Sequence, residues 1–217
     1  MNFYIYSFTF YLSIVTCYPQ AKVAKLSHYL LPEFTEGIVQ MKSGIENTYL
    51  LNYNMLTEEM IFKDQGKALA IGYTEMLLID TVFIRERKFF LLNDKFVELI
   101  YHSKCDLYAE NNCKVKYPGK PVAYDGTSQT SAVSSIGSFK SGSVVYDLKL
   151  PEDFEVKPYT HYWLLKNGIL NKFVNIRQLM KLYDSEKHLF NTYVKMNDVK
   201  YENQESIIRL INDMEIH

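Results

Sequence analysis

The chain has 217 residues, of which 47% are hydrophobic and 15% are aromatic, with 18 Tyr and 13 Phe. This length suits one substantial domain whose core needs no metal or disulfide to hold it together. The formal net charge of -1 leaves no basic excess to neutralise phosphates, so we expect no nucleic-acid partner.

The N-terminal residues 1–21 contain no Lys, Arg, Asp or Glu, and the first charged residue is Lys22. Phe3 to Val15 is an apolar and aromatic run with the length of a signal-peptide core, shorter than a membrane span of about 20 residues. We therefore predict a secretion signal and export to the periplasm or cell envelope, although no basic residue precedes the run. The alternatives are a lipoprotein signal that attaches the protein to a membrane through lipid on Cys17, a buried first strand, and an uncleaved membrane anchor.

Export favours a disulfide between Cys105 and Cys113, because the periplasm is oxidising. Their spacing suits a bridge across a tight hairpin that turns near Ala109. The alternative is a pair of free thiols on one strand, which would share a face because their numbers have equal parity. Neither a CxxC motif nor a Cys/His cluster occurs, so we expect no metal and no cofactor.

Short strands separated by turn residues follow one another from Phe34 to Tyr117. The alternation in 77–84 places the even-numbered residues, from Leu78 to Ile84, on one face of a strand. Asn93-Asp94 is typical of a two-residue hairpin turn, because both residues tolerate positive φ. No strand alternates with a long helix, so the pattern predicts an antiparallel meander that forms a curved sheet, sandwich or barrel. The predicted strands are 38–41, 48–53, 59–62, 68–71, 77–84, 88–92 and 95–101.

A segment rich in Ser, Thr and Gly, 118–143, interrupts this pattern and is predicted to be a flexible loop. Within it, residues 125–128 combine Asp125 with hydroxyl side chains, which makes them the candidate site of a hydrolase. No GxSxG motif and no neighbouring His supports that chemistry. We assign no catalytic residue, and Tyr124 and Asp125 enter the candidate binding surface because mobile loops often carry function.

A strand at 144–148 follows the loop, and then the clearest hairpin of the chain, 162–166 and 169–174 around Asn167-Gly168. Aromatic residues gather at its start, where the sequence reads Tyr159-Thr160-His161-Tyr162-Trp163. Such a cluster binds planar ligands or fills a core beneath helices. Tyr159, His161, Tyr162 and Trp163 therefore complete the candidate binding surface.

The last 43 residues, 175–217, have helical periodicity. Asn175 is a good N-cap, and Gln178 is placed to reach back to it. A second helix is capped by Asp184 or Ser185, and a third begins near Gln204. Each helix is short and must pack on the sheet to be stable.

Several strings, among them Glu36 to Gly44, Leu51 to Asn54, Ile79 to Val82 and the loop from Tyr124 to Ser135, resemble a family of exported Bacteroidetes proteins. That family carries no established activity, cofactor or catalytic residues. The resemblance implies an envelope location and a β-rich body, and nothing about chemistry.

The sequence therefore predicts an α+β fold, mainly β: an antiparallel meander with three short C-terminal helices packed on it. We expect a signal at 1–21, a β-rich domain at 22–174 and a helical segment of the same domain at 175–217. The expected function is a non-catalytic envelope protein that binds a protein or small molecule. The alternatives are a carrier of an apolar ligand in a curved sheet and a hydrolase with its site at 125–128.

Overall fold

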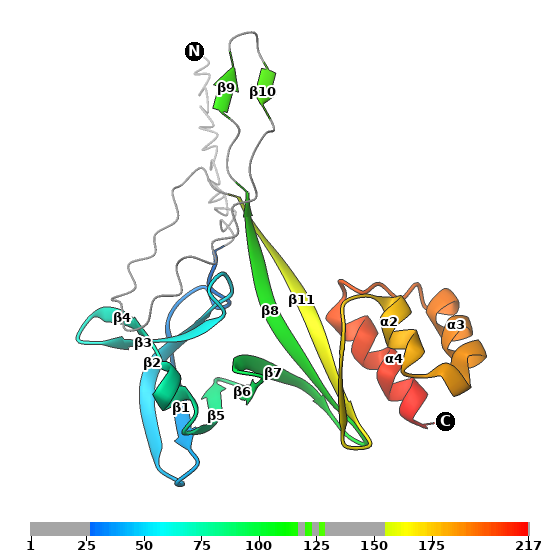
Figure 1. Ribbon diagram of the computed structural model, residues 1–217, viewed down its shortest axis with the longest axis horizontal. Helices are drawn as coiled ribbons and strands as arrows, with labels where there is room; N and C mark the ends of the chain where they lie inside the picture. Colours follow the sequence, from blue (N-terminus) through cyan, green and yellow to red (C-terminus); the bar gives the residue numbers. More distant parts are fainter. Residues whose placement is uncertain (1–26, 117–119, 123–125, 129–154, 217) are drawn as a thin grey trace, which may run out of the picture.

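The structure is a computed structural model that describes residues 27–116, 120–122, 126–128 and 155–216 (Figure 1). Its body is one antiparallel sheet of ten strands in the order β12-β11-β8-β7-β6-β5-β1-β2-β3-β4, followed by three C-terminal α-helices. The predicted fold class, α+β and mainly β, is confirmed. The strands of this sheet are β1 (Thr35–Met41), β2 (Glu46–Asn54), β3 (Glu59–Asp64), β4 (Lys67–Ala70), β5 (Ile79–Ile84), β6 (Arg87–Leu92), β7 (Lys95–His102), β8 (Asp106–Lys116), β11 (Glu155–Lys166) and β12 (Ile169–Phe173).

The first strand lies inside the sheet. The hairpins from β1 to β4 extend to one side of β1, and a short helix, α1 (Tyr73–Met76), then returns the chain. Because β5 pairs with the free side of β1, the strands from β5 to β8 extend in the opposite direction. Local sequence patterns predicted most of these strands, but they predicted neither α1 nor the long-range pairing of β1 with β5.

Two predicted hairpin turns are present. Asn93 and Asp94 have φ of 49° and 60°, and Asn167 and Gly168 have φ of 53° and 75°. Positive φ at both central residues matches the right-handed twist of the flanking strands. These turns fix the pairing of β6 with β7 and of β11 with β12.

The predicted face of β5 is wrong at its first residues. The register between β1 and β5 shifts so that Gln40 pairs with Thr81 and Met41 with Ile79, which leaves Asp80 as an extra residue. A bulge changes the parity of the strand. Ile79 therefore joins Val82 and Ile84 in the core, and Leu78 is 55% exposed.

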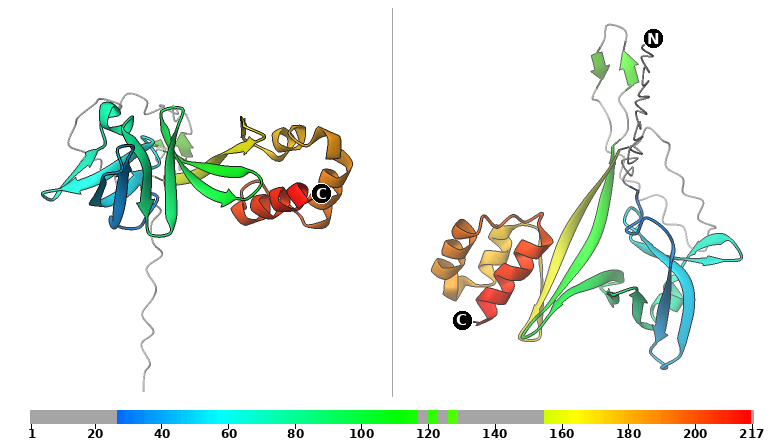
Figure 2. Two further views of the ribbon diagram at one scale, coloured as in Figure 1. Left: turned by 90° about the horizontal axis from the view of Figure 1, so that it is seen from below. Right: turned by 180° about the vertical axis from the view of Figure 1, so that it is seen from behind.

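The sheet curls around a first apolar core. β3 contacts β7 across the curve, and the backbone N–H of Cys113 in β8 donates to the carbonyl of Met55 in the β2–β3 turn (3.1 Å). Figures 1 and 2 show the meander curled at one end, with the long ribbon of β8 and β11 leading away from it towards the helices. The buried residues of this core are Leu31, Val39, Leu51, Tyr53, Met55, Met60, Ile79, Val82, Ile84, Phe89, Phe96, Cys113 and Val156.

The C-terminal helices form a second apolar core with the far end of the ribbon. The helices are α2 (Ile176–Lys181), α3 (Lys187–Met196) and α4 (Gln204–Ile216), with a 3-10 turn, η2 (Asp184–Glu186), before α3. They pack on Leu107, Ala109, Tyr162, Leu164 and Phe173 of β8, β11 and β12.

The start of α2 is capped as predicted. The side chain of Asn175 accepts a bond from the N–H of Gln178 (2.9 Å), and Gln178 Oε1 accepts one from the N–H of Val174 (2.8 Å). The N–H of Gln178 in the first turn and the N–H of Val174, just before the cap residue, are thereby satisfied. The cap fixes where the chain leaves β12 and enters the helical tail.

The predicted disulfide is wrong. Cys105 and Cys113 are buried free thiols, and β8 runs without a turn from Asp106 to Lys116. Ala109, where the hairpin turn was expected, pairs with Glu98 of β7 and Tyr162 of β11. Cys105 directly precedes β8, and the seven residue steps of strand from Asp106 to Cys113 span roughly 23 Å, so the two thiols lie far beyond the reach of a disulfide. Of the alternative, two free thiols on one strand, the structure shows that both are free, while only Cys113 lies within β8.

A polar group separates the two cores on this shared face of β8. Arg87 Nε donates to Glu98 Oε1 (2.8 Å), and Asn111 Nδ2 donates to Glu98 Oε2 (3.0 Å). Glu98 and Asn111 are buried. Cys105, Leu107 and Ala109 belong to the helical core on one side, and Cys113 belongs to the curled core on the other.

Several predictions fall on parts of the chain outside the described residues. These are the signal at 1–21 with Cys17, the strand at 144–148, and Tyr124 and Asp125. Within the predicted loop, β9 (Lys120–Val122) and β10 (Gly126–Ser128) form a separate two-stranded sheet. Asp125 and the side chains of 126–128 lie outside the described parts of the chain, so the hydrolase alternative at 125–128 stays a prediction.

Candidate functional site

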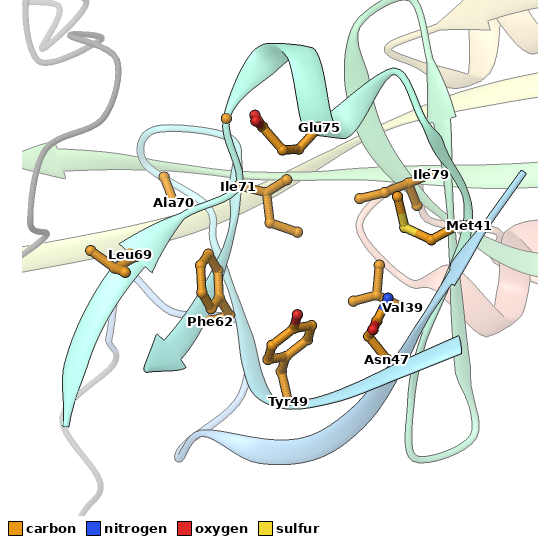
Figure 3. Close-up of a pocket in the computed structure, with 11 residues that line it drawn as sticks. Val39, Met41, Asn47, Tyr49, Phe62, Leu69, Ala70, Ile71, Glu75 and Ile79 are labelled. Carbon is orange, nitrogen blue, oxygen red and sulfur yellow. The ribbon is translucent and has the colours of Figure 1, made fainter. Parts of the chain in front are cut away.

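A largely apolar pocket of about 480 Å³ lies at the open end of the curled sheet. Its residues come from β1, β2, β3, β4, β5 and the segment that carries α1, as Figure 3 shows. The volume falls in the range of about 300–1,000 Å³ that is typical of small-molecule sites. The lining residues are Val39, Met41, Asn47, Tyr49, Phe62, Leu69, Ala70, Ile71, Gly72, Glu75 and Ile79.

Strand alternation explains why apolar side chains converge there. Val39 and Met41 are two residues apart on β1, as are Asn47 and Tyr49 on β2, so each pair points to the concave face. The bulge at Asp80 turns Ile79 to the same face. The pocket is therefore a continuation of the first core, from which Val39 and Ile79 also come.

The polar groups of the pocket lie on two sides of it. In Figure 3, Asn47 and Tyr49 lie at the β2 side and Glu75 at the α1 side, with Ile71 between them. The Tyr49 ring packs against Phe62, with centroids 5.4 Å apart. An apolar cavity with few polar groups at its ends is the usual form of a site for a small amphiphile.

The predicted aromatic cluster divides between the two faces of β11. Tyr162 is 1% exposed and packs on Phe173 and Tyr201 beneath the helices. The prediction that Tyr162 belongs to an exposed binding surface is therefore wrong. Tyr159, His161 and Trp163 have the opposite parity and lie on the other face of the ribbon. There they pair in register with Asn112, Glu110 and Tyr108 of β8.

Glu110 is the centre of this second cluster, and its side chain is 3% exposed. Its Oε2 accepts bonds from Trp163 Nε1 and Lys172 Nζ, both at 2.7 Å. Lys95 Nζ lies 3.5 Å from Oε1 and also pairs with Glu58 of the β2–β3 turn. The cluster joins β8, β11, β12 and β7 to the first hairpins.

The electrostatics of this cluster favour an ionised Glu110. Burial alone would raise its pKa, but the bonds from Lys172 and Trp163 and the charge of Lys95 outweigh burial and lower the pKa to about 2. Burial and the nearby charge of Lys172 lower the pKa of His161. At neutral pH the cluster thus holds a carboxylate, ammonium groups and a neutral imidazole, and its charges are largely satisfied internally.

The aromatic rings of this cluster are partly covered. The Lys172 ammonium lies 5.0 Å from the centroid of Trp163, and the Lys114 ammonium lies 5.1 Å from that of Tyr159. Each ring thereby has a cation over one face. An aromatic platform for planar ligands needs a free face, so the pocket of the curled sheet is the better candidate site.

Sequence patterns marked neither the pocket residues nor Glu110 as candidates for a functional site. Strand parity places Val39 with Met41 and Glu110 with Asn112, and that signal is present in the sequence. What the sequence does not state is the strand order, which brings β1 next to β5 and Lys172 next to Glu110. Both sites depend on pairings between distant segments.

Among the described residues, no group of three His, Cys, Asp or Glu side chains is placed to hold a metal ion. Within the same part of the chain, no helix is long and apolar enough to cross a membrane. Comparison of the chain with protein-family models, curated proteins and solved structures finds no match in any of the three.

Proposed function

We propose that this chain is a non-catalytic binding protein of the cell envelope that holds a small apolar molecule in the pocket of the curled sheet. The observation that carries the proposal is the apolar cavity of about 480 Å³ between β1, β2, β3, β4, β5 and the segment that carries α1. The burial of apolar surface supplies the affinity, about 25 cal/mol per Å² removed from water. The envelope location rests on the predicted export signal.

Competing sites have less support. The rings of Tyr159 and Trp163 are each covered on one face by Lys114 and Lys172, and Glu110 is satisfied by its own neighbours. The pocket, in contrast, has no described side chain filling it. An apolar cavity open to exchange is the arrangement expected of a carrier.

Binding is tested with N-phenyl-1-naphthylamine, a neutral apolar molecule whose fluorescence increases when it leaves water. We expect a saturable fluorescence increase at one site per chain. Replacing Ile71, which lies at the middle of the pocket in Figure 3, by Trp fills the cavity. Ile71→Trp should weaken binding by at least about tenfold, a loss of about 1.4 kcal/mol.

The matched control is Ile169→Trp, the same exchange at a residue of β12 that is 64% exposed and far along the sheet from the pocket. This variant should bind the probe like the wild type. Circular dichroism shows whether both variants keep the fold. Absence of saturable binding to the wild type, or equal binding by a folded Ile71→Trp, would contradict the proposed function.

A further inference from the structure

Among the described residues, one with a charged side chain lines the pocket. The other lining residues are apolar or, in the case of Asn47 and Tyr49, polar and neutral, and Glu75 supplies a carboxylate from α1. Figure 3 shows this carboxylate above Ile71, on the side of the pocket opposite Tyr49. A ligand whose apolar body fills the cavity would therefore end beside it.

The carboxylate of Glu75 forms no hydrogen bond or ion pair with any other described residue, although its main-chain carbonyl accepts from the N–H of Leu78 (3.0 Å). Lys42, next to Met41 in the chain, is bound to the end of α1 instead: its ammonium donates to the carbonyl of Leu77 (2.8 Å), and its N–H donates to that of Leu78 (2.9 Å). No described Lys or Arg lines the pocket or pairs with the Glu75 carboxylate. A ligand would meet an uncompensated negative charge.

Gly72 makes room for this carboxylate. A Cβ atom at position 72 would overlap the carboxyl group of Glu75, which lies against the backbone where α1 begins. Gly72 itself lines the pocket. The absence of a side chain at this residue lets the charge lie at the pocket wall instead of being displaced from it.

The consequence follows from Coulomb's law. A ligand that fills the cavity displaces water from one side of Glu75, which lowers the local dielectric constant and strengthens the interaction with a charge on the ligand. A carboxylate or phosphate at this end would be repelled. An ammonium group would form a charge-assisted hydrogen bond, which is stronger than a neutral one.

We propose that the pocket selects amphiphiles with an apolar body and an amine at one end, and that Glu75 is the residue that determines this specificity. The inference rests on the proposed function, because it requires the pocket to bind a ligand. It excludes free fatty acids as preferred ligands, although an apolar pocket of this size would otherwise suit them.

The test uses three compounds with the same chain, decylamine, decanol and decanoate, as competitors of N-phenyl-1-naphthylamine at neutral pH and low salt. We expect decylamine to bind about tenfold more tightly than decanol, and decanoate to bind most weakly. Glu75→Gln should bring decylamine and decanol within about twofold of each other, the size expected once the charge is gone. Glu75→Lys should make decanoate the preferred compound.

The matched control is Glu36→Gln, which removes one exposed carboxylate from β1, on the opposite face from Val39. It changes the net charge as Glu75→Gln does and should keep the preference for decylamine. If decanol displaces the probe but decylamine has no advantage, or if Glu75→Gln keeps that advantage, the specificity inference is wrong and the binding function stands. If the probe itself does not bind, the proposed function fails.

Discussion

Glu110 lies in the middle of β8 with almost no contact with solvent, yet it keeps its charge. Lys172 and Trp163 donate to the same oxygen, and the ammonium of Lys95 lies near the other. Removing a buried carboxylate from such a group leaves the donors without a partner, which costs more than the pair contributes when it is intact. Glu110 therefore stabilises the junction of β7, β8, β11 and β12.

We predict that Glu110→Gln lowers the free energy of unfolding by about 3 kcal/mol at pH 7, since a pKa lowered from 4.5 to about 2 corresponds to that amount. The folded-state pKa lies below the unfolded one. This stability is therefore fully present above pH 4.5 and is lost as the pH falls towards 2. Urea unfolding at several pH values measures the difference between wild type and variant, which should shrink over this window.

Glu36→Gln serves as the control, because exposed substitutions usually change stability by less than about 0.5 kcal/mol. A difference for Glu110→Gln that stays constant between pH 7 and pH 3 would contradict the assigned pKa. The sequence pointed to His161 and Trp163 in this region but not to Glu110. Its partner Lys172 is 62 residues away, and only the register of β8, β11 and β12 reveals the contact.

One face of β8 contributes side chains to both apolar cores. Cys105 and the next odd-numbered residues contact the helices, Asn111 joins the polar group around Glu98, and Cys113 contacts the curled sheet. Rules that act over a few residues predicted the Asn167-Gly168 turn and the Asn175 cap correctly. The disulfide prediction failed because it required a turn at Ala109, where neighbouring strands on both sides impose extended backbone.

We predict that the thiols of Cys105 and Cys113, at the start of β8 and within it, are unreactive in the folded protein. Burial raises the pKa of Cys105 to about 11 and that of Cys113 to about 12. The thiolate, which is the reactive form, is then about 100-fold scarcer or more than in an unperturbed thiol. Iodoacetamide labelling followed by peptide mass spectrometry should modify Cys105 and Cys113 in urea but not in buffer.

The same peptide maps distinguish free from bonded cysteine. Detection of a peptide pair joined through Cys105 and Cys113 in protein purified without reductant would contradict the structure. Rapid labelling of either residue in buffer would show that its strand opens readily. A hairpin that turned near Ala109 would have allowed a disulfide between Cys105 and Cys113. The experiment therefore tests whether β8 is one continuous strand.

At the scale of the whole molecule, the described residues form two cores on one ten-stranded sheet, with Arg87, Glu98 and Asn111 between them. Most strands and the helical tail were predictable because turn residues and periodicity are local signals, whereas α1 and the unbroken strand β8 were not predicted. The curvature was not, since it arises from the pairing of β1 with β5 and from the contact of Met55 with Cys113. The pocket is a product of that curvature.

We predict that damage to the helical core leaves the pocket intact. Leu210 of α4 is fully buried in the second core, so Leu210→Ala should destabilise the protein by about 3 kcal/mol. Well below its unfolding transition, the variant should bind N-phenyl-1-naphthylamine with an affinity within about twofold of wild type. Thermal unfolding and fluorescence titration measure the two effects.

A loss of probe binding by folded Leu210→Ala would show that the two cores are coupled through β8. The reciprocal comparison uses Ile71→Trp, whose effect should appear in binding and not in the packing of the helices. Near-ultraviolet circular dichroism of the tyrosines, including Tyr183 and Tyr201 in the helical tail, reports on that packing. The pair of variants thus separates stability from binding.

The sheet order also bears on self-association. An open sheet ends in strands with unpaired main-chain groups, and such edges promote polymerisation unless they are blunted. Here the outermost strands, β4 and β12, are only four and five residues long. Where β11 extends beyond β12, Pro158 has no N–H to offer, and the Tyr201 hydroxyl donates to the carbonyl of Thr160 (2.8 Å). The described edges therefore provide a poor template for fibril growth, a useful property for a chain so rich in aromatic strands.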